Sequence, residues 1–462
     1  MNKFPEDFKW GVATSSFQIE GATKVDGRGE SIWDRFCATE GKVANGEHGD
    51  IACDHYNLFA DDVAIMKSLG VNSYRFSLAW PRMFPKGDQV REQRGFDFYS
   101  RLIDELLNAG ITPVPTLYHW DLPQATHDRG GWANRDIVAQ FADYAGAIAT
   151  EFGDRAKKII TLNEPWCFTW LGHMSGVHAP GMKDLDFSIA TAHHSVLAHA
   201  EATRAMRAVH SDIESGITLN MTNFRVAEGS NPEVHELAEL QDAHINRWWI
   251  ESQLHGVYPQ ILVDHYGDKL ARVIKDGDMD VAKIDSEFLG INYYSDSFLS
   301  NPAESDKPAG DGGPFPFPQR ASGEVPQPTT DMGWPITPEG LYDLLMRIEH
   351  DWPEFKEISI TENGAAYPEG VDADGEVHDE RRVAYIRDHI ASVIRAAEDG
   401  SKIRSYFGWS FMDNFEWAEG YAKRFGLVHV DFDTQVRTPK DSAKAYAAII
   451  ASNGATLASV GR

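Results

Sequence analysis

Short apolar runs alternate with longer amphipathic stretches along most of the chain. In the amphipathic stretches, apolar residues recur three or four positions apart, which is typical of helices with one buried face. Residues 54–69 and 135–152 are clear examples, and Gly70, Gly110 and Gly153 each follow such a stretch. Glycine is common just beyond a helix, where the backbone often turns left-handed, so we expect these helices to end there.

The apolar runs are nearly continuous, as expected for strands of a sheet that is buried on both faces. A strand followed by a helix, repeated eight times without a break in composition, predicts an α/β fold. We expect a single (β/α)₈ TIM barrel with enlarged β-to-α loops, formed by residues 1–462 as one domain. The eight predicted strands are residues 10–14, 72–78, 112–118, 158–162, 216–220, 288–293, 358–361 and 403–409.

A segment rich in proline and glycine, residues 301–335, follows the sixth run. Such a segment is either a linker between domains or an enlarged loop. We favour the loop, because strands and helices resume beyond it. Long loops at the carboxyl end of barrel strands commonly contribute to binding sites.

Composition and charge exclude several classes of protein. The content of 42% hydrophobic and 11% aromatic residues indicates a folded chain. A formal net charge of −27 argues against nucleic acid and anionic membranes as partners, because phosphate is bound mainly by Lys and Arg. Three cysteines (Cys37, Cys53 and Cys167), without paired spacing, predict a reducing compartment. The first ten residues lack an apolar signal segment, so we expect a cytoplasmic protein.

Polar and aromatic residues gather where the predicted strands end, which is where barrels carry their chemistry. Glu164 and Glu362 stand out because each directly follows an apolar run. A single glutamate at such a place usually caps a helix or faces solvent. Two of them among indoles and amides suit the hydrolysis of glycosidic bonds, in which one carboxyl group protonates the leaving oxygen and the other attacks or activates water.

The other strand-end residues fit a sugar. A pyranose has an apolar C–H face that packs on flat rings, and a rim of hydroxyls that needs side chains able to donate and accept hydrogen bonds. The alternative for most of the 13 tryptophans is packing in the core. The candidate residues are Gln18, Arg75, His119, Trp120, Asn163, Asn292, Tyr294, Trp409, Glu416 and Trp417.

Six segments together resemble those of glycoside hydrolase family 1, the β-glucosidase family, and follow the family's order. They are residues 8–21, 74–80, 117–123, 161–166, 360–364 and 408–417. The resemblance implies a retaining β-glucosidase that acts without cofactor or metal. Its expected substrates are aryl and alkyl β-glucosides and short oligosaccharides such as cellobiose, with side activity on β-galactosides and β-fucosides.

The resemblance also implies a role for each candidate. Glu164 matches the general acid/base and Glu362 the nucleophile, with Arg75, Asn292 and Tyr294 beside them. Trp334 matches the aglycone-side tryptophan, Trp409 the platform beneath the sugar, and Trp120 is a further candidate for its face. The residues that match the contacts to sugar hydroxyls are Gln18, His119, Asn163, Glu416 and Trp417.

The two glutamates must hold different protonation states. We expect Arg75 and Tyr294 to keep Glu362 ionised, while Glu164 keeps a raised pKa. A retaining mechanism further predicts that the two carboxyl groups lie about 5 to 5.5 Å apart.

Several alternatives are disfavoured. A 6-phospho-β-glycosidase would bind phosphate, which Glu416 would repel. Lys423 is present but is followed by Arg424 and Phe425, so the set of phosphate ligands is incomplete. The myrosinase-like form has glutamine where this chain has Glu164. A non-catalytic sugar-binding barrel would be expected to lack one of the two glutamates.

The sequence gives weaker support for the remaining candidate sites. His193, His194 and His199 have no usual metal spacing. Cys167 is expected to be a small buried residue, with a place beside the aglycone as the alternative. Glucose and galactose differ only at O4, so both stay open as substrates, and no oligomeric state is predicted.

Overall fold

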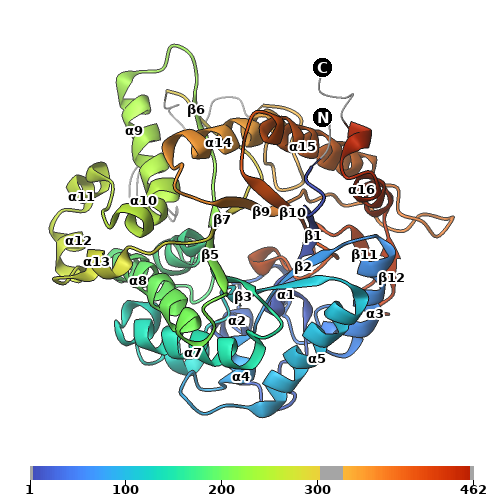
Figure 1. The fold of residues 1–462 in the computed structure, drawn as a ribbon, viewed down its shortest axis with the longest axis horizontal. Helices are drawn as coiled ribbons and strands as arrows, with labels where there is room; N and C mark the ends of the chain where they lie inside the picture. The colour runs from blue at the N-terminus through green and yellow to red at the C-terminus, as the bar shows by residue number, and fades with distance from the viewer. Residues whose placement is uncertain (1–3, 302–325, 458–462) are drawn as a thin grey trace.

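The computed structural model describes residues 4–301 and 326–457. Eight parallel strands close into a barrel in the order β1-β10-β9-β7-β5-β4-β3-β2, and helices surround it (Figure 1). The strands are β1 (Lys9–Ala13), β2 (Ser73–Ser77), β3 (Thr112–Tyr118), β4 (Lys158–Asn163), β5 (Glu214–Asn220), β7 (Phe288–Asn292), β9 (Glu357–Asn363) and β10 (Ile403–Trp409). The predicted barrel and all eight predicted strands are therefore confirmed.

The longer helices lie outside the barrel (Figure 1). They are α3 (His55–Ser68), α5 (Gln93–Ala109), α7 (Asp136–Phe152), α8 (Leu185–Val209), α9 (Pro232–Asp242), α10 (Trp248–His255), α14 (Pro338–Asp351), α15 (Glu380–Glu398) and α16 (Asp441–Ala451). Most of the predicted loop 301–335 lies outside the described residues, and the barrel continues on its far side with α14 and β9.

Shorter elements connect strands to helices. The short α-helices are α1 (Ser16–Ile19), α2 (Ile32–Cys37), α4 (Trp80–Met83), α6 (Gln124–His127), α11 (Gln260–Tyr266), α12 (Asp268–Val273) and α13 (Asp278–Ala282). Two segments are π-helical, η3 (Cys167–Ser175) and η4 (Ala243–Arg247). The 3₁₀ turns are η1 (Ala44–Gly46), η2 (Gly131–Ala133), η5 (Trp417–Glu419) and η6 (Ala455–Leu457). Two small sheets pair β6 (Phe224–Val226) with β8 (Ser297–Leu299) and β11 (Val428–Val430) with β12 (Arg437–Pro439).

All three predicted helix ends are confirmed, because α3, α5 and α7 end at Ser68, Ala109 and Phe152. Gly70 and Gly110 have φ of +75° and +79°, the left-handed conformation expected after α3 and α5. Gly153 directly follows α7 but has φ −66°, so only the expected left-handed conformation is wrong there. A Cβ at Gly153 would lie 2.4 Å from the Ala149 carbonyl oxygen and 2.6 Å from His210. Close packing, rather than a left-handed turn, accounts for this glycine.

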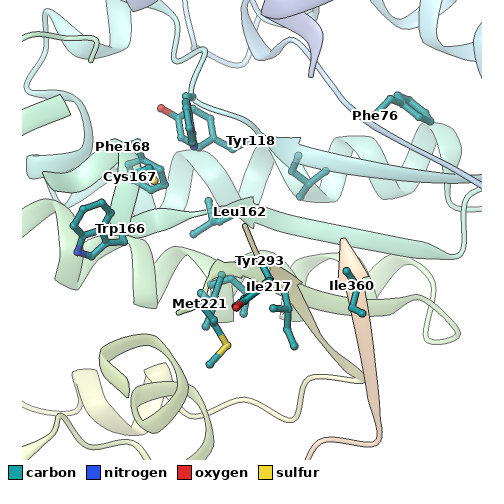
Figure 2. Close-up of a cluster of buried hydrophobic side chains, with 14 of the residues drawn as sticks. Phe76, Tyr118, Leu162, Trp166, Cys167, Phe168, Ile217, Met221, Tyr293 and Ile360 are labelled. Carbon is teal, nitrogen blue, oxygen red and sulfur yellow. The ribbon is translucent and has the colours of Figure 1, made fainter. Parts of the chain in front are cut away.

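Apolar side chains from neighbouring strands and the turns after them form a continuous buried core. Figure 2 shows part of it, with Trp166 and Cys167 on one side, Leu162 of β4 and Ile217 of β5 in the middle, and Ile360 of β9 on the other side. Several tryptophans pack in the core, which is the alternative that the sequence left open for them. Those among the largest fully buried side chains are Trp33, Trp80, Trp132, Trp170, Trp248 and Trp249. In the described ranges, no helix is long and apolar enough to cross a membrane.

Candidate active site

The carboxyl ends of the strands bring the predicted residues together through direct contacts. Arg75 lies in β2, Asn163 ends β4, Asn292 ends β7 and Glu362 lies in β9. Glu164 follows β4 and Tyr294 follows β7, and further groups come from the segments after β1, β3 and β10. These are Gln18, His119, Trp120, Glu416 and Trp417.

Arg75 is at the centre of the site, with its side chain only 1% exposed. Its Nη1 donates to Glu362 Oε1 at 2.7 Å, and its Nη2 donates to Asn163 Oδ1 at 2.6 Å. Tyr294 donates its hydroxyl to the other Glu362 oxygen, Oε2, at 2.6 Å. Each oxygen of Glu362 therefore accepts from a separate strong donor, and one of the donors carries a full positive charge.

Glu164 has weaker partners. Its Oε1 accepts from Asn292 Nδ2 at 2.6 Å, and its Oε2 accepts from the Cys167 thiol at 3.0 Å. Cys167 is buried, as expected from the sequence, but its contact with Glu164 was not predicted. The available signal was the spacing of three residues after Glu164, which puts the two side chains one helical turn apart.

Burial dominates the titration of both glutamates. It raises the pKa of Glu164, against the Cys167 and Asn292 hydrogen bonds and the Arg75 charge. It also raises the pKa of Glu362 to about 7; the Arg75 charge opposes this rise and the Glu164 charge adds to it. From the sequence we expected Arg75 and Tyr294 to lower the pKa of Glu362, but not the larger, opposite effect of burial. The burial of a strand end depends on the loops that cover it, which the sequence pattern does not show.

The contacts decide where a single shared proton resides. When Glu164 is protonated, its charge no longer disfavours the ionised form of Glu362. Glu362 then keeps the Arg75 guanidinium and the Tyr294 hydroxyl, both of which stabilise a carboxylate. These contacts favour a charge on Glu362 and a proton on Glu164.

His119 is neutral, and its hydrogen is assigned by its neighbours. Burial, followed by the Arg75 charge, lowers the pKa of His119 well below its usual value. Asn163 uses its oxygen to accept from Arg75 Nη2, so its Nδ2 faces His119 Nε2, 3.0 Å away. Nε2 must accept, which leaves the hydrogen on Nδ1. That buried nitrogen has no partner among the described residues, so it is free to donate to a ligand.

Gln18 and Glu416 form a second polar group. Gln18 Nε2 donates to the Phe415 carbonyl at 2.8 Å and lies 3.4 Å from Glu416 Oε2. Burial, together with the charges of Glu362 and Glu164, raises the pKa of Glu416 to about 8. A neutral carboxyl group both donates and accepts, which suits a sugar hydroxyl.

Aromatic rings line the same region. The Trp417 ring centre lies 4.5 Å from that of Trp120, and His119 stacks between Trp409 at 5.8 Å and Trp417 at 5.9 Å. Trp334 lies to one side, 5.3 Å from the Tyr294 ring, and is partly exposed. The rings thus form a wall on which the face of a sugar can pack.

Three site residues have left-handed backbones that residues with a side chain seldom adopt. Trp120, Glu164 and Trp417 have φ of +79°, +46° and +50°. Each such conformation costs of order 1–3 kcal/mol and persists only where its surroundings enforce it. The clustering of these residues around the two glutamates supports a functional role for the site.

Two kinds of site that the sequence disfavours, a phosphate site and a metal site, can be compared with the structure. Lys423 Nζ donates to the Asp331 carbonyl, and Arg424 pairs with buried Asp413, so both cations are engaged by the protein. His193 hydrogen-bonds Tyr258 and Asp278. Across the described parts of the chain, no group of three His, Cys, Asp or Glu side chains could hold a metal ion.

Known proteins resemble this chain over nearly its whole length. The family model described as glycosyl hydrolase family 1 matches residues 1–455. The chain is 44% identical to a 1,4-beta-D-glucan glucohydrolase of Thermotoga neapolitana over 99% of this chain and 100% of that protein. It is 40% identical to a bifunctional beta-D-glucosidase/beta-D-fucosidase of Bifidobacterium breve over 98% of this chain and 99% of that protein.

The fold is similar to that of a solved structure with a ligand. The beta-glucosidase from Thermotoga maritima in complex with deoxynojirimycin superposes with a TM-score of 0.90 and 41% identity, covering 98% of this chain and 100% of that chain.

Proposed function

The chain belongs to glycosyl hydrolase family 1, and on this premise we propose how it works as a β-glucosidase. Glu362 is the nucleophile and Glu164 the general acid/base of a retaining double displacement. The observation that carries these roles is the difference in partners. Glu362 contacts a guanidinium and a phenol, whereas Glu164 contacts an amide and a thiol.

In the first step, the Glu362 carboxylate attacks the anomeric carbon of the sugar. Glu164 gives its proton to the glycosidic oxygen as the bond to that oxygen breaks, and the aglycone leaves as an alcohol. The product is an ester between the sugar and Glu362. The state favoured by the contacts, with the proton on Glu164, is the one that this step requires.

In the second step, water attacks the anomeric carbon and the ester bond to Glu362 breaks. Glu164, now ionised, takes the proton from the water. The ester has no charge, so the pKa of Glu164 falls when the ester forms, which fits Glu164 to act as a base. Glucose leaves with its β configuration, and Glu362 is again a carboxylate.

The remaining residues hold the sugar. His119 Nδ1, Asn163, Gln18 and Glu416 contact its hydroxyls. The rings of Trp409, Trp417 and Trp120 pack against its face, while Trp334 lies on the aglycone side. The resemblance to a relative named for both glucosidase and fucosidase activity supports side activity on β-fucosides.

The substrates are terminal β-glucosides of aryl and alkyl alcohols and short oligosaccharides such as cellobiose. We further propose that residues 1–462 form a single domain, because the strand and helix units complete one barrel. The three free cysteines support a cytoplasmic location, where thiols stay reduced.

Stereochemistry and chemical rescue together test the assignment. Proton NMR of early turnover should show β-glucose before any α-glucose. Glu164→Ala should lose about 10²–10⁴-fold on alkyl glucosides and far less on dinitrophenyl glucoside, whose leaving group needs no proton. Added azide should then yield β-glucosyl azide from Glu164→Ala and α-glucosyl azide from Glu362→Ala.

The matched control is Glu354→Ala, because Glu354 is an exposed glutamate paired with His255. It should retain wild-type rates. Release of α-glucose first would contradict retention. Azide products of the opposite configuration would mean that the roles of Glu164 and Glu362 are exchanged or that the assignment is wrong.

A further inference from the structure

Cys167 is a partner of Glu164 to which the proposed mechanism gives no role. Its Sγ lies 3.0 Å from Glu164 Oε2, and its backbone N–H donates to the Glu164 carbonyl at 2.9 Å. The residue begins the π-helical segment η3, which starts four residues after the end of β4. This turn fixes the thiol beside the carboxyl group, and Figure 2 shows Cys167 in the buried layer between Trp166 and Phe168.

The amide of Asn292 determines which Glu164 oxygen carries the transferable proton. Asn292 Oδ1 accepts from Thr361 Oγ1 at 2.8 Å and faces Arg75 Nη1 at 3.4 Å. Its Nδ2 therefore faces Glu164, and donates to Oε1 at 2.6 Å. Oε1 thus already accepts a hydrogen bond from a group that can only donate, so a proton on Glu164 is better placed on Oε2.

Oε2 is the oxygen that faces the thiol. A thiol can donate weakly to a carboxylate and can also accept weakly from a carboxylic acid. Burial and the Glu164 charge raise the pKa of Cys167 well above its usual value, so Sγ keeps its hydrogen. Cys167 can therefore form a hydrogen bond with Glu164 in both of its protonation states.

We propose that Cys167 is a positioning residue for Glu164, whose thiol holds Oε2 and favours the ionised carboxylate that the second step needs. This inference rests on the proposed function, in which Glu164 is the general acid/base. Cys167 itself takes no proton and forms no bond to the sugar. It acts on the balance between the acid and base forms of Glu164.

Other groups also act on that balance and stay in place when Cys167 is replaced. Asn292 contacts Glu164 directly. The titratable groups that interact with Glu164 from the surrounding elements are Arg75 of β2, Tyr294 after β7, Glu362 of β9 and Glu416 after β10. A change in the titration of Glu164 in a Cys167 variant is therefore assigned to the thiol.

The test is the pH dependence of kcat/KM for an alkyl β-glucoside, whose leaving group needs the proton of Glu164. Activity falls as pH rises through the pKa of Glu164, which gives the basic limb of the profile. Loss of a hydrogen bond to the carboxylate raises that pKa. Cys167→Ala and Cys167→Val should move the basic limb upward by ~0.5–1 pH unit.

Cys167→Ser keeps a donor and should hold the limb at or below its wild-type position. Cys37→Ala is the matched control, because it removes another buried thiol whose nearest acidic neighbours are Asp34 and Asp50 rather than Glu164. Its limb should coincide with that of the wild type. A purely structural role for Cys167 would lower the rate at every pH and leave the limb where it is.

Two results would overturn the inference: a wild-type limb in both Cys167→Ala and Cys167→Val, or an upward shift in Cys167→Ser as large as in Cys167→Ala. Glu164→Gln separates this failure from failure of the proposed function. If Glu164→Gln keeps the wild-type basic limb, Glu164 is not the acid/base. If it loses the limb while Cys167→Ala leaves it unmoved, only the role of Cys167 is wrong.

Discussion

The hydroxyl of Tyr294 gives a quantitative test of how the site keeps Glu362 ionised. It donates to Glu362 Oε2 at 2.6 Å. Burial and the charges of Glu362 and Glu164 raise the pKa of Tyr294 well above its usual value, so the hydroxyl stays protonated and donates to the carboxylate. Tyr294→Phe removes this donor and retains the ring, which packs against Trp334 and Phe425.

The expected effect follows from the strength of the lost contact. A hydrogen bond to a charged group contributes about 1.5–3 kcal/mol. Since one pKa unit corresponds to about 1.4 kcal/mol, the pKa of Glu362 should rise by ~1–2 units. As the proposed nucleophile, Glu362 must be ionised to attack, so activity is lost as pH falls through its pKa. The acidic limb of kcat/KM should therefore move to higher pH by the same amount.

The assay is the initial rate on p-nitrophenyl β-glucoside across the pH range, with the product measured after an alkaline quench. Arg75 remains on Glu362 Oε1, so the rate above the shifted limb should recover most of the wild-type value. Tyr258→Phe is the matched control, because its hydroxyl contacts His193 outside the site. An equal loss of rate at every pH, with the acidic limb unmoved, would refute the reasoning.

Two further predictions concern the support of the site and of the fold. A Cβ at Gly364 would lie 1.6 Å from the Trp409 carbonyl oxygen, whereas a Cβ at Gly370 would meet nothing within 4 Å. Gly364→Ala should therefore displace the strand ends and lower kcat/KM by ~100-fold, while Gly370→Ala should be neutral; equal kinetics of the two variants would contradict this. Burial opposes ionisation of Asp278, but hydrogen bonds from Arg135, the Lys275 backbone and His193 hold the pKa of Asp278 well below its usual value. Its ionised form therefore stabilises the protein above the usual pKa of about 4, and this contribution is lost as pH falls below it. Asp278→Asn should lower the free energy of unfolding in urea by ~1–3 kcal/mol at pH 7 and by less at pH 3, and a difference that stays constant with pH would count against the mechanism.

The strands and the site face could be predicted because both follow from local patterns. Strands buried on two faces must be apolar almost throughout, so eight such runs predict the barrel. All strands of a parallel barrel end at one face, so Glu164 and Glu362 are expected together even though they are far apart in sequence. Gly153 shows the limit of such patterns. Its lack of a side chain leaves room for His210, a contact that no local pattern reveals.

The sequence by itself therefore determined the barrel and the placing of Glu164 and Glu362 where its strands end. Only the tertiary structure decided which partners each glutamate has, how far burial raises the pKa of each, which His119 nitrogen carries the hydrogen, and that Cys167 faces Glu164. The physical reason is that periodicity depends on near neighbours along the chain. Hydrogen bonds such as those of Arg75 to Asn163 and Glu362, by contrast, exist only once distant strands have closed into a ring.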